Sequence, residues 1–365
     1  LKARELAPDV RGVWVLRDPK AEDIPPGIEA VAQDTWGYYR VLARAKYLVN
    51  NANFPDFVRK RRGSVHLQTQ HGTPLKKMGV ELIEFPVGAA EMDFPMLLKR
   101  IDRWDFNISS NPYSTEVWER SNPAAFETLE VGYPRNDRLV LATDEDKQEV
   151  RAKLGIAPNA GQVLLYCPTF RDYRLGFDPE IDLARVLDAL GDDGVLLMRA
   201  HYFNGHNKLT AAAERERSKR MIDVSEYPSI EDLCIASDAL LTDYSSIMFD
   251  YAILDRPIVI YAYDWDSYVR TRGVNFDLLA EPPGFVATTA DELLTGLRTG
   301  EAWGEAAAKL RADFRDRFCE YDDGRASERV VRRVFLGQRL PADMESDSTS
   351  VTAASADDDD SDREV

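Results

Sequence analysis

Residues 240–264, LLTDYSSIMFDYAILDRPIVIYAYD, decide the fold because they predict a strand, a turn, a helix and a second strand in succession. The first apolar run ends at Thr242 and Asp243, Ser245 and Ser246 open the helix, and PIVIYAYD is apolar again. Two apolar strands joined by a helix are typical of a parallel β-α-β unit. The stretch therefore predicts an α/β protein in which polar residues gather at the carboxyl ends of parallel strands.

The same alternation recurs along the chain. A first series of strands is predicted at 12–18, 46–52, 64–70, 105–111 and 129–133, and a second series at 162–170, 194–202 and 221–227. Helical patterns separate these strands, which predicts two Rossmann-like domains with parallel sheets around one cleft. We expect an N-terminal domain at 1–140 that lacks its opening strand, and a C-terminal domain at 141–338 closed by one helix over 307–337.

Composition and charge narrow the class of protein. The 365 residues carry a formal net charge of −17, and the Ser, Thr, Ala and Asp content of the acidic tail, 339–365, predicts disorder. Such an acidic chain argues against non-specific nucleic-acid binding. The chain has no run of about 18 apolar residues and no signal-peptide pattern, which argues against a membrane span and against secretion. Three widely separated cysteines fit neither a disulfide framework nor a metal site, and favour a reducing compartment.

The stretch QTQHGTPLKKMG (68–79) places His71 at the carboxyl end of the predicted strand SVHLQ. An imidazole has the right unperturbed pKa to take a proton from a hydroxyl near neutral pH. Gly72 permits an unusual backbone angle next to it. We predict that His71 is a general base and that Gly72 and Thr73 belong to the same binding loop. The alternative is that His71 only caps or bridges the turn.

Cationic side chains follow two strands of the second series. CPTFRDYR (167–174) places Arg171 beyond one strand, and LLMRAHYF (196–203) places Arg199 and His201 at the end of the next. A guanidinium can hold a phosphate by paired hydrogen bonds, and an imidazole beside it can stabilise the charge on a leaving phosphate. We therefore predict a diphosphate site there. Taken singly, these residues also fit a solvated arginine or a histidine bonded to neighbouring backbone.

The turn TDYSS (242–246) has the composition of a second anion site. Ser245 and Ser246, together with the first amide groups of the following helix and its dipole, predict a phosphate-binding helix start, and Asp243 lies beside them. An ordinary helix cap is the alternative, although a cap needs a single serine.

The stretch DFPMLLKRIDRW (93–104) is amphipathic, with apolar residues along one helical face and Lys99, Arg100 and Arg103 on the other. This spacing predicts a core helix packed under the cleft. A helix lying in a membrane interface is the alternative.

Together these motifs resemble those of the CDP-glycerol glycerophosphotransferase family, the teichoic-acid primases and polymerases. The resemblance runs in the family's order from about residue 36 to residue 332, and the cluster is more specific than any one motif. It rests on QTQHGTPLKKMG, NISSNPYSTEVW, GYPRND, CPTFRDYR, RAHYF, DVSEYPSIEDLCIASDALLTDYSSIMFDYAILDRPIVIYAYD and DGRASERVV.

The resemblance implies a GT-B type fold, in which two Rossmann-like domains face a central cleft and a C-terminal helix crosses back. It also implies transfer of glycerol phosphate from CDP-glycerol to a hydroxyl of a membrane-anchored, lipid-linked acceptor, with release of CMP. By motif, His71 matches the catalytic base, and His201 matches a second active-site histidine that contacts the donor's phosphates. The residues that match or adjoin phosphate-binding positions are Arg171, Arg199, Asp243, Ser245 and Ser246.

The implied reaction is an in-line attack by an acceptor hydroxyl, deprotonated by His71, on the phosphorus next to glycerol. We expect no required cofactor, because fixed donors can neutralise the charge that other phosphoryl-transfer sites give to a metal, although a loosely bound Mg²⁺ would leave no sequence signature. The expected partners are CDP-glycerol or a related CDP-polyol, the lipid-linked acceptor and, as an open question, further copies of the chain. The expected location is cytoplasmic, peripheral at the inner face of the cell membrane.

Gln70 departs from the family pattern, because an aromatic residue is expected before the histidine, and this departure bears on contacts to the acceptor. Three alternative functions stay open. The donor can be CDP-ribitol or another CDP-polyol, because the motifs do not report polyol length. The chain can be a GT-B glycosyltransferase that uses a nucleotide sugar and releases a nucleoside diphosphate. It can also be a scaffold without turnover, against which His71 and His201 argue.

Overall fold

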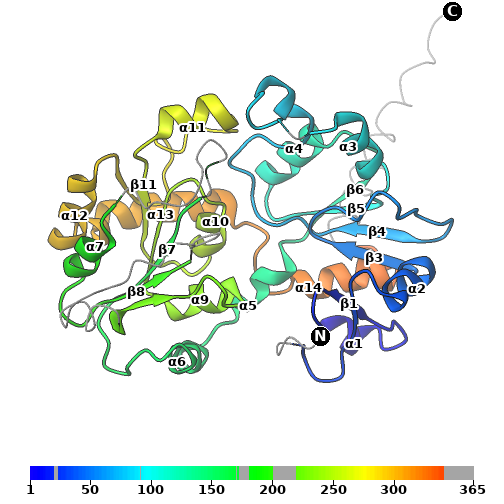
Figure 1. The fold of residues 1–365 in the computed structure, drawn as a ribbon, viewed down its shortest axis with the longest axis horizontal. Coiled ribbons are helices and arrows are strands. Elements are labelled where there is room, and N and C mark those ends of the chain that lie inside the picture. Colours follow the sequence, from blue (N-terminus) through cyan, green and yellow to red (C-terminus); the bar gives the residue numbers. More distant parts are fainter. Residues whose placement is uncertain (20–23, 91, 170, 172–180, 200–218, 341–365) are drawn as a thin grey trace, which may run out of the picture.

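A computed structural model describes residues 1–19, 24–90, 92–169, 171, 181–199 and 219–340 (Figure 1). The described strands form three sheets in which every pair of neighbours is parallel. The strand order is β12-β11-β10-β7-β8-β9 in a six-stranded sheet, β3-β4-β5-β6 in a four-stranded sheet and β1-β2 in a two-stranded sheet. The prediction of an α/β fold with parallel sheets is therefore confirmed.

The first half of the chain contains the two smaller sheets and the helices around them. Its strands are β1 (Val13–Leu16), β2 (Glu29–Ala32), β3 (Tyr47–Asn50), β4 (Val65–Gln68), β5 (Phe106–Ser109) and β6 (Glu127–Glu130). Its helices are α1 (Lys2–Leu6), α2 (Trp36–Arg44), α3 (Phe94–Ile101) and α4 (Pro112–Ser121), with a 3-10 turn at η1 (Gly79–Glu84). The side chains of Thr35, Asp93 and Asn111 begin α2, α3 and α4, because each accepts a hydrogen bond from a first-turn backbone N–H.

The second half contains the six-stranded sheet. Its strands are β7 (Val163–Cys167), β8 (Val195–Met198), β9 (Met221–Asp223), β10 (Ala239–Thr242), β11 (Ile258–Tyr261) and β12 (Phe285–Ala287). Its helices are α5 (Asp137–Val140), α6 (Asp144–Lys153), α7 (Leu183–Ala189), α9 (Ile230–Ala236), α10 (Ile247–Ala252), α11 (Trp265–Arg272), α12 (Ala290–Thr299) and α13 (Glu305–Phe318). The last elements are α14 (Ala326–Val330) and a π turn, η4 (Val331–Phe335).

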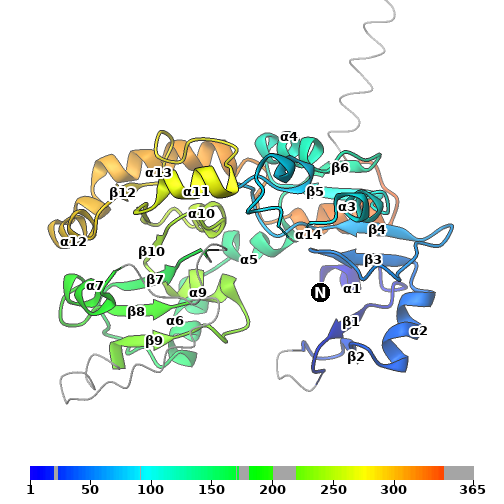
Figure 2. The same cartoon turned by 45° about the horizontal axis from the view of Figure 1, so that its top comes forward.

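Helices cover both faces of the six-stranded sheet (Figures 1 and 2). Every residue of β7, β10 and β11 is buried, as expected for central parallel strands that have no solvent face. Successive residues alternate between two cores. Leu164 and Leu241 pack with α7 and α12, whereas Leu165 and Leu240 pack with α9, α10 and α13. This three-layer packing fixes the strand ends from which the polar loops emerge.

The C-terminal end of the described chain packs against the four-stranded sheet. Val330 of α14 and Val334 of η4 lie in one hydrophobic cluster with Leu67 of β4 and Ile108 of β5. Leu340 is buried in the same cluster. The predicted start of the disordered tail, at residue 339, is therefore wrong, because Leu340 still belongs to the folded part. The remainder of that tail, 341–365, lies outside the described residues.

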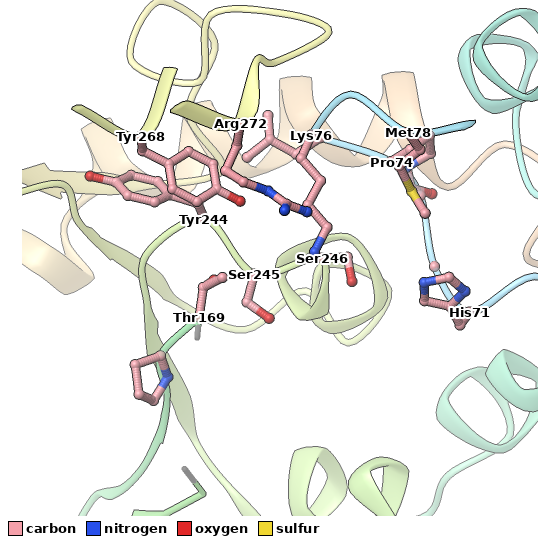
Figure 3. Close-up of a pocket in the computed structure, with 14 residues that line it drawn as sticks. His71, Pro74, Lys76, Met78, Thr169, Tyr244, Ser245, Ser246, Tyr268 and Arg272 are labelled. Carbon is pink, nitrogen blue, oxygen red and sulfur yellow. The ribbon is translucent and has the colours of Figure 1, made fainter. Parts of the chain in front are cut away.

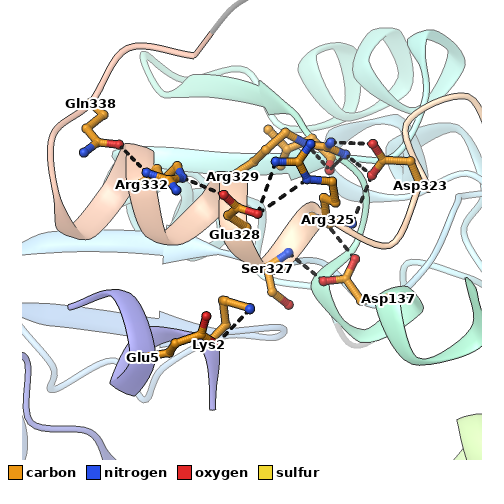
Figure 4. A network of polar contacts seen from close by, with 12 residues as sticks. Lys2, Glu5, Asp137, Asp323, Arg325, Ser327, Glu328, Arg329, Arg332 and Gln338 are labelled. Carbon is orange, nitrogen blue, oxygen red and sulfur yellow. Dashed lines mark hydrogen bonds and ion pairs between the residues drawn. The ribbon is translucent and has the colours of Figure 1, made fainter. Parts of the chain in front are cut away.

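The closing helix predicted over 307–337 is wrong as a single helix. The structure divides it into α13 and α14, separated by residues 319–325. The first helix ends at Phe318, and Gly324 in the connection has a φ of 82°, which a continuous α-helix cannot contain because it requires a negative φ. The Asp137 carboxylate then accepts the first two backbone N–H groups of α14 at 2.9 and 2.8 Å (Figure 4). A side chain from far away in the sequence therefore caps the second helix.

The amphipathic stretch 93–104 packs inside the protein. Leu97 and Ile101 of α3 are buried with Trp104 in a small cluster that also contacts Phe126. Most of the apolar face of the helix is therefore covered, with Leu98 as the exposed exception at 40%, which favours the core helix over the membrane-interface alternative. Across the described part of the chain, no helix is both long enough and apolar enough to cross a membrane.

Candidate functional site

A pocket of about 490 Å³ lies where loops from the two larger sheets meet (Figure 3). One wall is the segment 71–78 after β4, here called the His71 loop. The opposite wall comes from the residues that follow β7 and β10, together with α11. The carboxyl ends of parallel strands therefore border the pocket, as is usual for ligand sites in α/β proteins. The lining residues are His71, Gly72, Thr73, Pro74, Leu75, Lys76, Met78, Pro168, Thr169, Tyr244, Ser245, Ser246, Tyr268 and Arg272.

The side chain of His71 is exposed to the pocket, although the surrounding surface is concave and crowded by protein atoms. This crowding lowers the pKa of His71 below 6.5, and the positive charge of Lys76 lowers it further. A hydrogen bond from the ring to the backbone of Asn51 acts in the opposite direction. The same bond holds one ring nitrogen as a donor, so the other nitrogen can accept a proton near neutral pH.

Gly72 is the point where the His71 loop comes closest to the opposite wall. Its φ is 140°, a backbone conformation that residues with a side chain rarely adopt. A Cβ at this position would lie 3.0 Å from the Ser246 hydroxyl and 3.3 Å from Nη2 of Arg135. Arg135 belongs to the GYPRND motif and forms an ion pair with Asp250 of α10 at 2.5 Å. The glycine therefore allows His71 to approach the serine turn.

Thr73 fixes the His71 loop to the sheet that carries it. Its buried hydroxyl lies 3.2 Å from the Ser110 hydroxyl, and the Asn111 amide donates to it at 3.4 Å. The same amide donates to the carbonyl oxygen of Phe318 at 2.7 Å. The family motif NISSN thus acts here through hydrogen bonds that position the loop.

The rest of the His71 loop crosses to the other half of the molecule. Lys76 pairs with Val274 in an isolated antiparallel bridge, which two further backbone hydrogen bonds of 2.8 and 3.1 Å support. The Asn275 side chain donates to the carbonyl oxygens of Pro74 and Lys76, both at 3.2 Å. We call this pairing between the His71 loop and residues 273–275 the clasp. It holds the two walls of the pocket together from one side.

Ser245 and Ser246 both line the pocket at the start of α10, as the sequence predicted for an anion site. Ser246 occupies the cap position without a side-chain cap hydrogen bond. Ser245 accepts a long bond of 3.5 Å from the backbone N–H of Ile247. Because α10 has six residues, its dipole is small, and the two hydroxyl groups are the stronger donors toward an anion.

Arg171 and Asp243 lie behind the pocket wall rather than in it. Arg171 contacts Asp264 twice and Asp243 once, each at 2.9 Å, and its side chain is 6% exposed. Asp243 accepts backbone hydrogen bonds from Thr169 at 2.8 Å and Tyr244 at 2.5 Å. The Arg171 guanidinium compensates the charge of Asp243, and the Asp243 carboxylate holds Thr169 and Tyr244 at the pocket surface. A phosphate-binding role for Arg171 or Asp243 stays a prediction.

Arg199 and His201 were predicted to contact the donor's phosphates. Arg199 follows β8, is half-buried and donates to the carbonyl oxygen of Tyr227 at 2.6 Å; it is not among the residues that line the pocket. His201 lies within 200–218, outside the described residues. The relation of His201 to His71 is therefore still a prediction.

Two cations of the pocket were not predicted as site residues. Lys76 of the His71 loop and Arg272 at the end of α11 both line the pocket, and Figure 3 shows their side chains extending into it. Lys76 lies in a stretch that we had identified for its histidine. Arg272 gave no local signal, because a helix-terminal arginine is common on surfaces. The clasp brings them together from positions almost 200 residues apart.

Gln70, the departure from the family pattern, does not line the pocket. It is buried, has a positive φ of 53° and donates through Nε2 to Asn107 of β5 at 2.6 Å. Its side chain is therefore part of the support beneath the His71 loop. This position does not support a direct contact between the Gln70 side chain and the acceptor.

The described residues contain no group of three or more His, Cys, Asp or Glu side chains placed to hold a metal ion. The fixed positive charge that the pocket presents comes from Lys76 and Arg272. Together with the hydroxyls of Thr169, Ser245 and Ser246, these cations suit a ligand with phosphate groups.

Comparisons with known proteins agree with the motifs. The family model described as CDP-glycerol:poly(glycerophosphate) glycerophosphotransferase matches residues 1–336. The teichoic acid poly(glycerol phosphate) polymerase of Staphylococcus epidermidis is 34% identical over 335 residues, which is 88% of this chain and 46% of that protein. The teichoic acid glycerol-phosphate transferase of Staphylococcus aureus is 35% identical over 310 residues, covering 82% of this chain and 78% of that protein.

A solved structure has the same fold. A variant of the wall teichoic acid polymerase TagF soaked with CDPG superposes with a TM-score of 0.79 at 33% identity, over 92% of this chain and 82% of that chain. The chain thus spans about half the length of the polymerase of S. epidermidis that it matches.

Proposed function

Because the chain belongs to the CDP-glycerol:poly(glycerophosphate) glycerophosphotransferase family, we propose that it transfers glycerol phosphate from CDP-glycerol to a hydroxyl of a lipid-linked acceptor and releases CMP. The observation that supports this most directly is the pocket itself. It sets an exposed imidazole on one wall against two serine hydroxyls on the other, with two cations nearby. This set of groups suits the transfer of a charged phosphate to a neutral hydroxyl.

In the proposed reaction, the acceptor oxygen attacks the phosphorus bound to glycerol while His71 takes the hydroxyl proton. A new bond forms between that oxygen and phosphorus, and the bond from phosphorus to the oxygen bridging to CMP breaks. The electron pair leaves with CMP. The lowered pKa of His71 keeps its imidazole neutral and ready to accept the proton at pH 7.

The charge that builds on the departing CMP needs fixed donors. Ser245, Ser246, Lys76 and Arg272 line the same pocket and can donate to phosphate oxygens without a metal. His201 and Arg199 are further candidates for this task by family motif. If a loosely bound Mg²⁺ were required instead, chelation by EDTA would abolish turnover, and we expect it not to.

The proposed arrangement is of the GT-B type. An acceptor-side domain over 1–140 and a donor-side domain over 141–338 would face a central cleft that contains the pocket. The packing of α14 on the four-stranded sheet supports a C-terminal helix that crosses back to the first domain. We further propose a peripheral position at the inner face of the cell membrane, where the lipid-linked acceptor would be met, and leave homo-oligomers open.

The test is CMP release from the full-length protein incubated with a lipid-linked acceptor and either CDP-glycerol or CDP-ribitol. We expect release from CDP-glycerol, and a loss on the order of 10²- to 10⁴-fold in His71→Ala, the usual contribution of a general base. Release from CDP-ribitol alone would transfer the assignment to that donor. A nucleoside diphosphate product from a nucleotide sugar would indicate a glycosyltransferase. The proposal is wrong if neither donor yields CMP or if His71→Ala keeps most of the activity.

A further inference from the structure

The segment that leads from the four-stranded sheet to the six-stranded sheet contributes an arginine that the proposed reaction has not used. Arg135 lies in η2 (Pro134–Asn136), a 3-10 turn between β6 and α5. Figure 1 shows α5 between the two halves of the molecule. Arg135 is not among the described residues that line the pocket, yet its guanidinium lies beside Gly72, where the two walls come closest. The passage between the two halves therefore runs next to the site.

Arg135 and Ser246 reach Gly72 together. A Cβ on Gly72 would lie 3.3 Å from Nη2 of Arg135 and 3.0 Å from the hydroxyl of Ser246. The guanidinium, the serine hydroxyl and the backbone next to His71 therefore meet at one place. Because Gly72 directly follows His71, the position of this arginine affects the spacing between the imidazole and the serine on the opposite wall.

Asp250 connects Arg135 to the serine turn. Nη2 of Arg135 donates to one oxygen of the Asp250 carboxylate at 2.5 Å, and the Asn136 amide donates to the other oxygen at 3.2 Å. Asp250 is four residues after Ser246, about one helical turn farther along α10. Two neighbouring residues of η2 thus hold one carboxylate of α10, so a shift of η2 would be transmitted to the Ser246 hydroxyl.

The acids around Arg135 keep its guanidinium charged. Burial acts to lower the pKa of Arg135, but the negative charges of Asp250 and Glu231 outweigh this effect and the pKa is raised. Asp322, in the connection between α13 and α14, accepts a hydrogen bond of 3.3 Å from the Asn136 amide, and burial raises its pKa to about 7. Among the described residues, Asp250 is the acid that pairs with Arg135 directly.

The positive charge of Arg135 also acts on His71. Burial lowers the pKa of His71, Lys76 lowers it further, and Arg135 adds a smaller effect in the same direction. A charge has such an effect only when it lies close to the imidazole, which agrees with the geometry at Gly72. Arg135 is therefore adjacent to both groups whose spacing the proposed reaction requires.

We propose that Arg135 is a positioning residue of the transfer reaction, and that through Asp250 it fixes the spacing between His71 and the Ser246 hydroxyl. In the proposed reaction, His71 takes the proton of the acceptor hydroxyl while Ser246 donates to a phosphate oxygen, so both must reach one substrate at the same time. The inference rests on the proposed function and adds a residue to it. Direct contact between Arg135 and a phosphate is the alternative, because the buried Nε of Arg135 has no hydrogen-bond partner among the described residues.

The experiment is a double-mutant cycle on CMP release at pH 8, where His71 is neutral in every variant. Arg135→Met should lower kcat on the order of 10²-fold, the usual cost of misplacing reacting groups by about 1 Å, and change the KM for CDP-glycerol less. Asp250→Ala should lower kcat similarly. Because Arg135 acts through Asp250, adding Arg135→Met to Asp250→Ala should lower kcat little further. Arg135→Lys keeps one bond to Asp250 and should lose less than Arg135→Met.

The double variant also leaves neither charge without its partner, so it tests the proposal even where a single variant folds poorly. Circular dichroism checks the fold of each variant. The pH profile supplies a readout that lost stability alone would not change. Arg135→Met removes a positive charge near His71, so the acidic limb of kcat/KM should move to higher pH, whereas Arg135→Lys should leave it in place.

Arg138→Met is the matched control. Arg138 pairs with Asp232 at 2.7 Å and so joins α5 to α9, three residues after Arg135, and it is not among the described residues that line the pocket. The control should keep both kcat and the acidic limb of the unchanged protein. The contrast between Arg135 and Arg138 separates a tie to the serine turn from any tie made by this segment.

Three results would overturn the proposal. Independent losses that multiply in the double variant would mean that Arg135 contacts the substrate directly. A kcat of Arg135→Met equal to that of the control, or an acidic limb that does not move, would mean that Arg135 does not position His71 and Ser246. If the unchanged protein releases no CMP from either donor, the proposed function fails and this inference fails with it. Normal release by the unchanged protein together with an unaffected Arg135→Met refutes the inference alone.

Discussion

The two walls of the pocket hold their polar groups in opposite ways. The His71 loop exposes its imidazole, and its backbone is held from outside by the clasp and by Thr73. Behind the opposite wall, Arg171 and Asp243 are buried and neutralise each other. The groups of that wall that reach the pocket are hydroxyls and tyrosine rings, with Arg272 at its edge. A charged residue after a strand end can therefore shape a site without being the group that meets the ligand.

The largest effect is expected from Arg171→Met, which removes the centre of the buried cluster. The change leaves the buried carboxylate of Asp243 without its cationic partner, and such a loss typically costs about 3–5 kcal/mol of unfolding free energy. Burial raises the pKa of Asp243. The stranded charge is therefore partly removed by protonation as pH falls, and the destabilisation should be larger at pH 8 than at pH 5.

Urea unfolding at the two pH values measures this effect. Arg185→Met is the matched control, because Arg185 pairs with Asp291 on the surface, where both side chains are exposed, and such pairs contribute about 0–1 kcal/mol. If Arg171→Met unfolded like the control, the buried cluster would not be what stabilises this wall. The buried charges of this wall would then contribute no more to stability than an exposed ion pair does.

The next effect is expected where the walls touch. Gly72→Ala places a methyl group 3.0 Å from the Ser246 hydroxyl at a φ that disfavours any side chain, with about 2 kcal/mol of strain. Relieving that strain would move His71 away from the serine turn, so CMP release should fall by roughly 30-fold at most if the strain appears fully in the barrier. Steady-state rates and unfolding curves should change together.

Gly155→Ala separates backbone strain from crowding. Gly155 also has a positive φ, of 72°, but a Cβ there would meet nothing within 4 Å, and it lies outside the pocket. The control should lose stability and keep its rate. An unchanged rate in Gly72→Ala would show that close approach of the His71 loop to Ser246 is not needed.

The sequence predicted the parts of this arrangement that depend on local pattern. Apolar runs located the buried strands, and the turns after them located His71, Ser245 and Ser246, all of which line the pocket. These features are visible because a parallel strand and its polar end are adjacent in the chain. The sequence did not predict the break between α13 and α14, because the helical pattern on both sides of Gly324 is continuous.

The contacts that the sequence did not reveal are those between distant segments. Arg171 was predicted as a ligand group, but its partners Asp243 and Asp264 are about 70 and 90 residues away, and no local pattern reports that pairing. The clasp likewise joins Lys76 to Val274, a pairing that no local sequence pattern predicts. Long-range pairing therefore decides which cations face the pocket and which support it.

A smaller effect is expected from loosening the clasp. Asn275→Ala removes the two side-chain hydrogen bonds to Pro74 and Lys76, each contributing about 0.5–1.5 kcal/mol. Because Asn275 positions the His71 loop, kcat should fall by several-fold while the KM for the donor changes less. Asn53→Ala, in an exposed loop, is the control and should leave both constants unchanged. A change confined to KM would instead indicate that Asn275 acts on donor binding.

The smallest expected effect, a shift in the pH dependence of CMP release, isolates the charge that the clasp brings near His71. Lys76 lowers the pKa of His71, so Lys76→Met should raise that pKa toward 6.5. His71 acts as a base only when neutral, and the acidic limb of kcat/KM should therefore move to higher pH. Lys77→Met is the matched control, because Lys77 pairs with Glu81 at 2.7 Å and does not line the pocket. A limb that stays in place in Lys76→Met, or moves equally in both variants, would mean that the limb does not report His71.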